Sequence, residues 1–210
     1  MFALVESGSI TKFFSGNQGI TIGDNQYPKA IFTLWTKSER EAIGIYQVEM
    51  DNSKRKDEQW YINTNVTYAF GGGKVTGSYG DSTAKKPADT LYTNQDKTDG
   101  KIPDGKDVGD VKTRGLKYNL IQTIKKQAAG ILKNTDWYVI RKADAGTAVP
   151  SKITTHRAAV RTKAAEMETS ITNASDTPAL ETLYAYVNTA DEGDPVVMER
   201  PLGELPRLES

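Results

Sequence analysis

The chain has 210 residues, with 27 basic and 27 acidic side chains, one His and no Cys. At about 100–200 residues per domain, this length predicts one or two domains. The lack of Cys excludes a disulfide framework, and a single His excludes the usual multi-His zinc sites. No apolar run approaches the roughly 18 residues of a membrane span. The net charge is zero, whereas a general nucleic-acid binder normally carries an excess of basic residues. We therefore expect no cofactor, no metal, no membrane span and no nucleic acid.

Charge is uneven along the chain. Residues 112–172 carry 12 basic and 4 acidic side chains, a net +8, whereas residues 173–210 carry 2 basic and 8 acidic ones, a net −6. In one interpretation the basic segment meets an acidic partner, or the tail of one subunit docks on the middle of another. In the other, the charges form a solvated helix face and an acidic tail folded back on its own chain. Exposed ion pairs contribute only about 0–1 kcal/mol each, which favours the second interpretation.

Residues 1–80 predict a small β-rich domain with a short helical insertion. Apolar runs at 2–5 and 10–14 flank a Ser-Gly turn, which is typical of a hairpin. Pro28 and the capping-box spacing of Ser38 and Glu41 predict a helix that ends at Gly44. Further strands are expected at 45–50, 60–62, 66–70 and 74–79, with a turn at 63–65 between the second and third of these.

Two segments have little hydrophobic periodicity. Residues 81–114 are rich in Gly and Asp and predict a polar linker or a long surface loop. Residues 189–210 carry three Pro residues and predict an extended C-terminal tail. We expect 94–114 and 189–210 to become ordered only in an assembly, since binding then offsets the entropic cost of ordering.

Residues 115–188 predict a three-helix module. The first helix has an apolar stripe, and the second follows Pro150 with a stripe that includes His156. A third helix begins at Asp176-Thr177-Pro178, a cap followed by Pro. The stretch 134–141 between the first two helices reads as non-helical, and the two longer helices are expected to pair as a helical hairpin.

Together these elements predict an α+β chain. Its expected parts are a β-rich domain at 1–80, a polar linker at 81–114, a helical module at 115–188 and an extended tail at 189–210.

Two motifs resemble ligand-binding loops but lack the residues that those loops require. The cluster Gly71-Gly72-Gly73-Lys74 lacks the earlier Gly and the following Ser or Thr of a phosphate-binding loop, so a turn at a strand end is expected. The Asp-rich stretch 96–110 departs from the ligand spacing of a calcium-binding EF-hand loop. Neither motif predicts a ligand site.

The most distinctive local feature is Thr135-Asp136-Trp137. Trp brings a large apolar surface to a core or an interface, and Asp136 has three candidate partners for an ion pair. Those partners are Arg141, Arg157 and Arg161. The residues then form either a clamp inside the domain or an interface with a partner. His156 lies on the apolar stripe with no second His or Cys, and we interpret it as structural rather than catalytic.

The C-terminal half resembles a module of tailed-bacteriophage proteins that are linked to tail fibres and tail assembly. The resemblance is carried by residues 135–141, Pro150 and the stretch His156-Arg157-Ala158-Ala159-Val160-Arg161. In that module a "TDW" sequence and a Pro precede a helix of "YRxxLR" type, whose Tyr position is His156 here and whose Leu position is Val160. The N-terminal stretches 2–6, 27–28, 38–40 and 43–46 also resemble small phage tail proteins.

The resemblance implies a non-enzymatic protein of a phage tail. The first hypothesis is a structural part of the virion that contacts tail-fibre or baseplate proteins, is oligomeric in assembly and lies in the host cytoplasm until it is assembled. The second is a tail-fibre assembly chaperone that leaves after the fibre has formed. A receptor- or glycan-binding module is a third, since aromatic residues of the β-rich domain could stack on sugars; these are Tyr46, Trp60, Tyr61, Tyr68 and Tyr79. An enzyme is the least favoured, because sequence spacing places no pair of carboxylates across a cleft.

Overall fold

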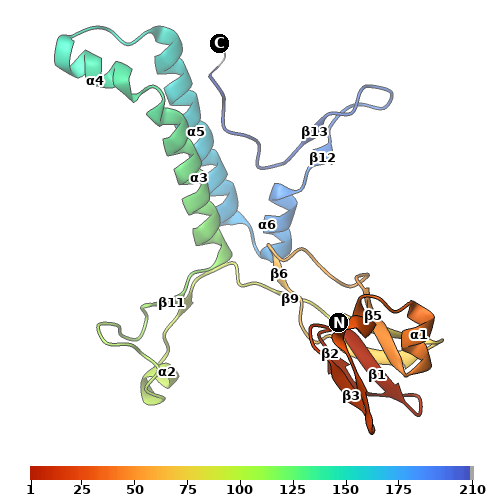
Figure 1. The fold of residues 1–210 in the computed structure, drawn as a ribbon. Helices are drawn as coiled ribbons and strands as arrows, with labels where there is room; N and C mark the ends of the chain where they lie inside the picture. Colours follow the sequence, from red (N-terminus) through yellow and green to blue (C-terminus); the bar gives the residue numbers. More distant parts are fainter. Residues whose placement is uncertain (209–210) are drawn as a thin grey trace. The chain divides into compact units, whose positions relative to one another are not determined.

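The structure, a computed structural model, describes residues 1–208 and has the predicted α+β composition. It divides into two compact units, Met1–Thr83 and Ala84–Ser210. Most strands lie in the first unit, and the long helices lie in the second (Figure 1).

The first unit is built on a five-stranded sheet of order β2-β1-β5-β8-β7. Neighbouring strands are antiparallel except β5 and β8, which are parallel. The predicted hairpin at 2–14 is confirmed, with Phe2 opposite Phe14. The elements of this unit are β1 (Phe2–Glu6), β2 (Ser9–Phe14), β3 (Ile20–Ile22), β4 (Asn25–Tyr27), the 3₁₀ helix η1 (Lys29–Phe32), α1 (Lys37–Ala42), β5 (Ile45–Asp51), β6 (Tyr61–Ile62), β7 (Thr67–Gly71) and β8 (Lys74–Ser78), while β9 (Thr83–Ala84) spans the division between the units.

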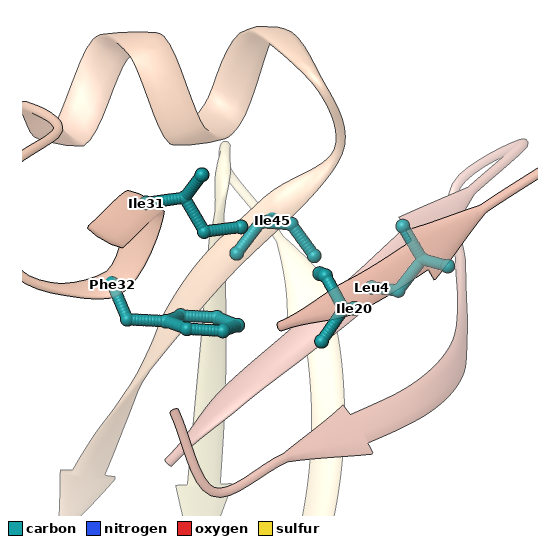
Figure 2. Close-up of a cluster of buried hydrophobic side chains, with 5 residues drawn as sticks. All are labelled: Leu4, Ile20, Ile31, Phe32 and Ile45. Atoms are coloured by element: carbon teal, nitrogen blue, oxygen red, sulfur yellow. The ribbon is translucent and has the colours of Figure 1, made fainter. Parts of the chain in front are cut away.

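One face of this sheet packs on η1. Leu4 and Ile45 are opposite each other on β1 and β5, and Ile31 and Phe32 of η1 cover them together with Ile20 (Figure 2). All five side chains are buried. Burial of each contributes roughly 1.5–3 kcal/mol, so this cluster is the main core of the first unit.

The sheet is curved into a half-barrel, and its other face is on the inner side. Ala3 and Val75 are buried on this face. The ring of Phe13 on edge strand β2 lies 4.8 Å from the ring of Tyr68 on the opposite edge strand β7. This contact brings the two edges together, and it places Tyr68 in a packing role.

The helical insertion begins differently from the prediction. Residues 29–32 form a 3₁₀ helix after Pro28, and the capping box is made by Thr36 and Glu39 rather than by Ser38 and Glu41. The Thr36 hydroxyl accepts a hydrogen bond from the Glu39 backbone N–H, and the Glu39 carboxylate accepts one from the Thr36 N–H. The two overlapping Thr/Ser-x-x-Glu patterns differ by two residues, and the earlier one sets the start of α1.

The turn expected at 63–65 does not join two paired strands. The strands at 61–62 and 67–71 exist, but β7 pairs with β8 through a turn at Gly72-Gly73, not with β6. Both of these Gly residues have positive φ, which a two-residue hairpin turn of type I′ requires. The Gly cluster is therefore a turn at a strand end, as expected.

The second unit contains four longer helices and several short elements. Its elements are β10 (Thr90–Leu91), α2 (Asn94–Thr98), β11 (Val111–Thr113), α3 (Leu116–Lys133), α4 (Asp136–Ala145), α5 (Ser151–Asn173), α6 (Thr177–Tyr184), β12 (Val187–Asn188) and β13 (Met198–Glu199).

The segment expected to be a structureless linker or loop has local structure. β10 pairs with β11, and a capping box of Thr93 and Asp96 starts α2. Residues 86–89 also cap α3, because backbone carbonyls of Lys86 and Pro87 accept hydrogen bonds from the first backbone N–H groups of that helix. Polar side chains and backbone hydrogen bonds build these elements, so hydrophobic periodicity gave no signal of them.

The predicted pairing of the two longer helices is confirmed: α3 and α5 lie side by side (Figure 1). The stripe expected on α5 is buried, including His156, and Ile124 and Ala128 are buried on α3. Asp176 caps α6 through the backbone N–H of Ala179, as expected. The buried stripe of α5 consists of Ile153, His156, Val160, Ala164, Met167 and Ile171.

Two expectations about irregular segments are wrong. Residues 136–141 belong to α4, which ends at Gly146 in the left-handed conformation with φ +69°. The Trp-Tyr-Val-Ile run favours a strand locally, but tertiary contacts override that preference. The tail is not simply extended, because β12 and β13 form a hairpin and Leu202 is buried, with its backbone N–H bonded to the carbonyl of Leu183. Residues 209–210 of the expected tail lie outside the described residues.

Candidate protein-contact surface on helix α4

The junction between α3 and α4 is held by a buried threonine. Thr135 follows the C-cap of α3, and both its backbone N–H and its hydroxyl donate hydrogen bonds to the Leu132 carbonyl, at 3.0 Å each. Its own carbonyl accepts a bond from the backbone N–H of Tyr138 in the first turn of α4. Thr135 therefore satisfies backbone groups at the end of one helix and the start of the next.

Arg157 of α5 joins the same junction from the neighbouring helix. Its Nη1 donates to the Leu132 carbonyl and to the Thr135 hydroxyl, at 2.7 Å each, and lies 2.8 Å from Oδ1 of Asp136. The Arg157 side chain is only 13% exposed. We call Thr135, Asp136 and Arg157 the corner clamp.

The charges of the corner clamp suit the helix ends that they occupy. The guanidinium lies at the C-terminal carbonyl of α3, where a positive charge is favourable, and Asp136 occupies the first turn of α4, where a negative charge is favourable. Of the three Arg residues considered as partners for Asp136, the structure selects Arg157. The ion pair of the first alternative, a clamp inside the domain, is therefore present for these residues.

Trp137 takes part in none of the clamp's hydrogen bonds and stacks with Arg141. The guanidinium of Arg141 lies 4.6 Å from the Trp137 ring centroid and 5.5 Å from that of Tyr138. The two rings are themselves 4.1 Å apart. These cation–π contacts, one helical turn apart, hold the indole in place on the surface of α4.

Three large apolar side chains of α4 are exposed. Trp137 is 51% exposed, Val139 44% and Ile140 66%. No side chain of α4 is fully buried. We call Trp137, Val139 and Ile140 the α4 patch. Trp137 and Ile140 lie three residues apart and so share a side of the helix, whereas Val139 follows Trp137 by two residues and lies on a different side. Large exposed apolar side chains on a helix fixed by a buried clamp are typical of a surface that contacts another protein.

The remaining predicted residues lie elsewhere. His156 is buried on the apolar stripe of α5, between Ile153 and Val160 along the helix, in agreement with a structural role. Arg161 is exposed, one turn beyond Arg157, and takes no part in the corner clamp. The structure therefore brings Thr135, Asp136 and Arg157 together and pairs Trp137 with Arg141 as a neighbouring group.

The expectation of a non-helical stretch at 134–141 gives no reason to group Val139 and Ile140 with Trp137. A helix starting at Asp136 places Trp137 and Ile140 three residues apart on one side. Asp136 is the sequence signal for the start of this helix, and Gly146 at its C-cap is the signal for its end.

The structure gives little support to the other kinds of site. Trp60 and Tyr61, two of the aromatic residues considered for sugar stacking, are buried, and Tyr46 packs edge-on against Phe70 at 4.9 Å. Within residues 1–208 no group of three or more His, Asp or Glu side chains is arranged to hold a metal ion. The described helices include none that is both long and apolar enough to cross a membrane.

Comparisons with known proteins gave no match: no family model, no curated protein and no solved structure matches the chain.

Proposed function

We propose that the chain is a non-enzymatic structural component of a bacteriophage tail, associated with a fibre or the baseplate in the virion and acting through protein–protein contacts. The observation that carries the proposal is the α4 patch, an apolar surface on a helix whose position is fixed by the corner clamp. A surface fixed in advance binds without a further ordering cost.

The resemblance to phage tail-assembly modules supports the same surface. The residues that carry it include Thr135, Asp136 and Arg157, which the fold brings within hydrogen-bonding distance of one another. Trp137 of the same motif is the largest side chain of the α4 patch. The spaced motif thus describes one structural unit, a corner that presents an indole to solvent.

The test is mass spectrometry of purified particles of a phage that encodes this chain, with copy number measured against the major tail protein. A structural component is expected at a fixed copy number in every preparation. Abundance in the infected-cell lysate together with absence from particles would contradict the proposal and favour the alternative, a transient tail-fibre assembly chaperone. A chaperone would also raise the soluble yield of its fibre on co-expression.

A variant connects the particle experiment to the surface. Trp137→Ala removes the indole without touching the Arg157 hydrogen bonds, and we expect reduced incorporation into particles. Leu34→Ala is the matched control, since Leu34 is a highly exposed apolar side chain of the first unit. Equal incorporation of the two variants would remove the α4 patch from the proposal.

A further inference from the structure

The hairpin of β12 and β13 exposes an unusual amount of apolar surface. Five large side chains between 186 and 198 are 46% to 71% exposed. They are Tyr186, Val187, Val196, Val197 and Met198. Only two residue pairs form the ladder, and an isolated two-stranded hairpin is marginally stable in water. The register places Val187 and Met198 on opposite faces of the hairpin, so both faces expose apolar side chains. Exposed large apolar side chains of this number mark a contact element.

The same hairpin is acidic. Residues 186–199 contain four carboxylates and no Lys or Arg, a net charge of −4. In the described part of the chain none of the four forms an ion pair. They are Asp191, Glu192, Asp194 and Glu199. We call residues 186–199 the acidic hairpin.

The corner that carries the α4 patch has the opposite charge. Residues 133–161 contain six basic and two acidic side chains, a net charge of +4. One of the two acids, Asp136, is already paired with Arg157. Among the described residues Lys133, Arg141, Lys142, Lys152 and Arg161 form no ion pair with a carboxylate. We call residues 133–161 the basic corner.

We propose that the acidic hairpin of one copy docks on the basic corner of a second copy. Both surfaces combine exposed apolar side chains with uncompensated charge, and the charges are equal and opposite. In the structure the chain covers neither surface, since the apolar side chains of both remain exposed and no described ion pair joins them. A second copy supplies both the apolar cover and the opposite charge.

The contact joins two different surfaces of the same chain, so it is head-to-tail. Such a contact closes into a ring when the rotation between copies permits and otherwise grows as a filament. The inference rests on the proposed function only in treating the α4 patch as a protein-contact surface. It concerns the purified chain, so its failure and the failure of particle incorporation are separate results.

Sedimentation velocity of the purified chain at concentrations between about 5 and about 200 μM tests the contact. We expect concentration-dependent association that weakens between 50 mM and 500 mM salt, because salt screens exposed charges. Trp137→Ala is expected to weaken association at least tenfold, whereas Leu34→Ala leaves it unchanged. A wild-type chain that stays monomeric over the whole concentration range would overturn the proposal. The two surfaces would then be contact surfaces for a different protein.

A charge swap makes the test specific. One variant reverses the hairpin (Asp191→Lys, Glu192→Lys and Asp194→Lys), and the other reverses the corner (Lys142→Glu, Lys152→Glu and Arg161→Glu). Each alone carries like charges on both surfaces and is expected to be monomeric. Mixed in equal amounts, the two variants are again complementary at both kinds of contact and should associate.

Each possible result of the swap decides the proposal. Restored association in the mixture supports it, because no general change of net charge or stability produces that outcome. Association of either variant alone at the wild-type strength, or no association in the mixture with both variants folded by circular dichroism, would overturn it.

Discussion

Nη1 of Arg157 lies 2.8 Å from Oδ1 of Asp136, so a side chain of α5 fixes the start of α4. The same nitrogen donates a hydrogen bond to the Leu132 carbonyl in the last turn of α3, so three helices meet at one guanidinium. Because Arg157 is largely buried and Asp136 is half exposed, the hydrogen bonds to α3 carry more of the free energy than the ion pair does.

Replacement of Arg157 by Ala is expected to lower the free energy of unfolding of the second unit by about 1–3 kcal/mol, since the buried Thr135 hydroxyl loses its donor and the Leu132 carbonyl loses one of its donors. Asp136→Ala removes a half-exposed ion pair and should cost only about 0.5 kcal/mol. Urea unfolding followed by circular dichroism at 222 nm measures both. Arg161→Ala, one turn along α5, is the control and should change little. A cost of Arg157→Ala no greater than that of Arg161→Ala would show that the clamp contributes nothing.

The packing of α3 and α5 gives a second prediction. Met167 is 1% exposed on the buried stripe, so Met167→Ala leaves a cavity and should lower the free energy of unfolding by about 2–5 kcal/mol. The adjacent Glu166 is exposed and makes only a surface ion pair with Lys163, so Glu166→Ala should cost less than about 0.5 kcal/mol. The same urea experiment compares them. Equal costs for the two substitutions would mean that the α3–α5 interface does not stabilise this unit.

Asp96 links α2 to β11 and gives a pH dependence. The hydrogen bond from Lys112, and then those from the backbone N–H and hydroxyl of Thr93, lower the pKa of the Asp96 carboxyl from 3.8 to about 2. Because the folded-state pKa lies below the unfolded value, the stabilisation is fully present above about pH 4 and is lost as the pH falls from 3.8 through about 2. Nuclear magnetic resonance titration of the Asp96 carboxyl carbon measures this directly, and a midpoint near 3.8 in the wild-type chain would rule the network out.

Lys112→Ala should raise the pKa of Asp96 towards 3.8 without reaching it, since Thr93 still donates two hydrogen bonds. Asp89 serves as the internal control. The Gly115 backbone N–H and then the Arg114 side chain lower its pKa, and Lys112 takes no part, so its titration should stay unchanged in the variant.

Elements with a buried apolar stripe or a strong local signal were predictable from the sequence. The stripe of α5 from Ile153 to Ile171 and the Asp176 cap of α6 fall in this class. The corner clamp is predictable in part, because the sequence contains Asp136 and three candidate Arg partners but carries no distances between them. Only the fold selects Arg157, which is 21 positions from Asp136 along the chain.

Elements built from polar groups were not predictable in this way. β10, α2 and β11 depend on hydrogen bonds between residues such as Thr93, Asp96 and Lys112, which have no periodic pattern. The acidic hairpin depends on Asn188, whose Oδ1 accepts hydrogen bonds from the backbone N–H groups of Ala190 and Val197. Short apolar stretches on both sides of an Asp-Glu-Gly-Asp turn were the available signal for that hairpin.

Two glycines of the first unit form a matched pair that separates backbone strain from a close contact. Gly44 has φ +80° and Gly23 has φ +55°, so an Ala at either position is strained, at a cost of about 1–2 kcal/mol. A Cβ at Gly44 would also lie 2.8 Å from the backbone oxygen of Val5, whereas a Cβ at Gly23 meets nothing within 4 Å. Because Val5 donates its N–H to the Gly44 carbonyl at 2.8 Å, neither backbone can move away without losing that bond.

We therefore expect Gly44→Ala to destabilise the first unit by about 1–3 kcal/mol more than Gly23→Ala does, which is the typical cost of overpacking against a backbone that cannot move. Unfolding followed through the fluorescence of the buried Trp60 measures the difference, and equal midpoints for the two variants would show that strand β1 yields at Val5.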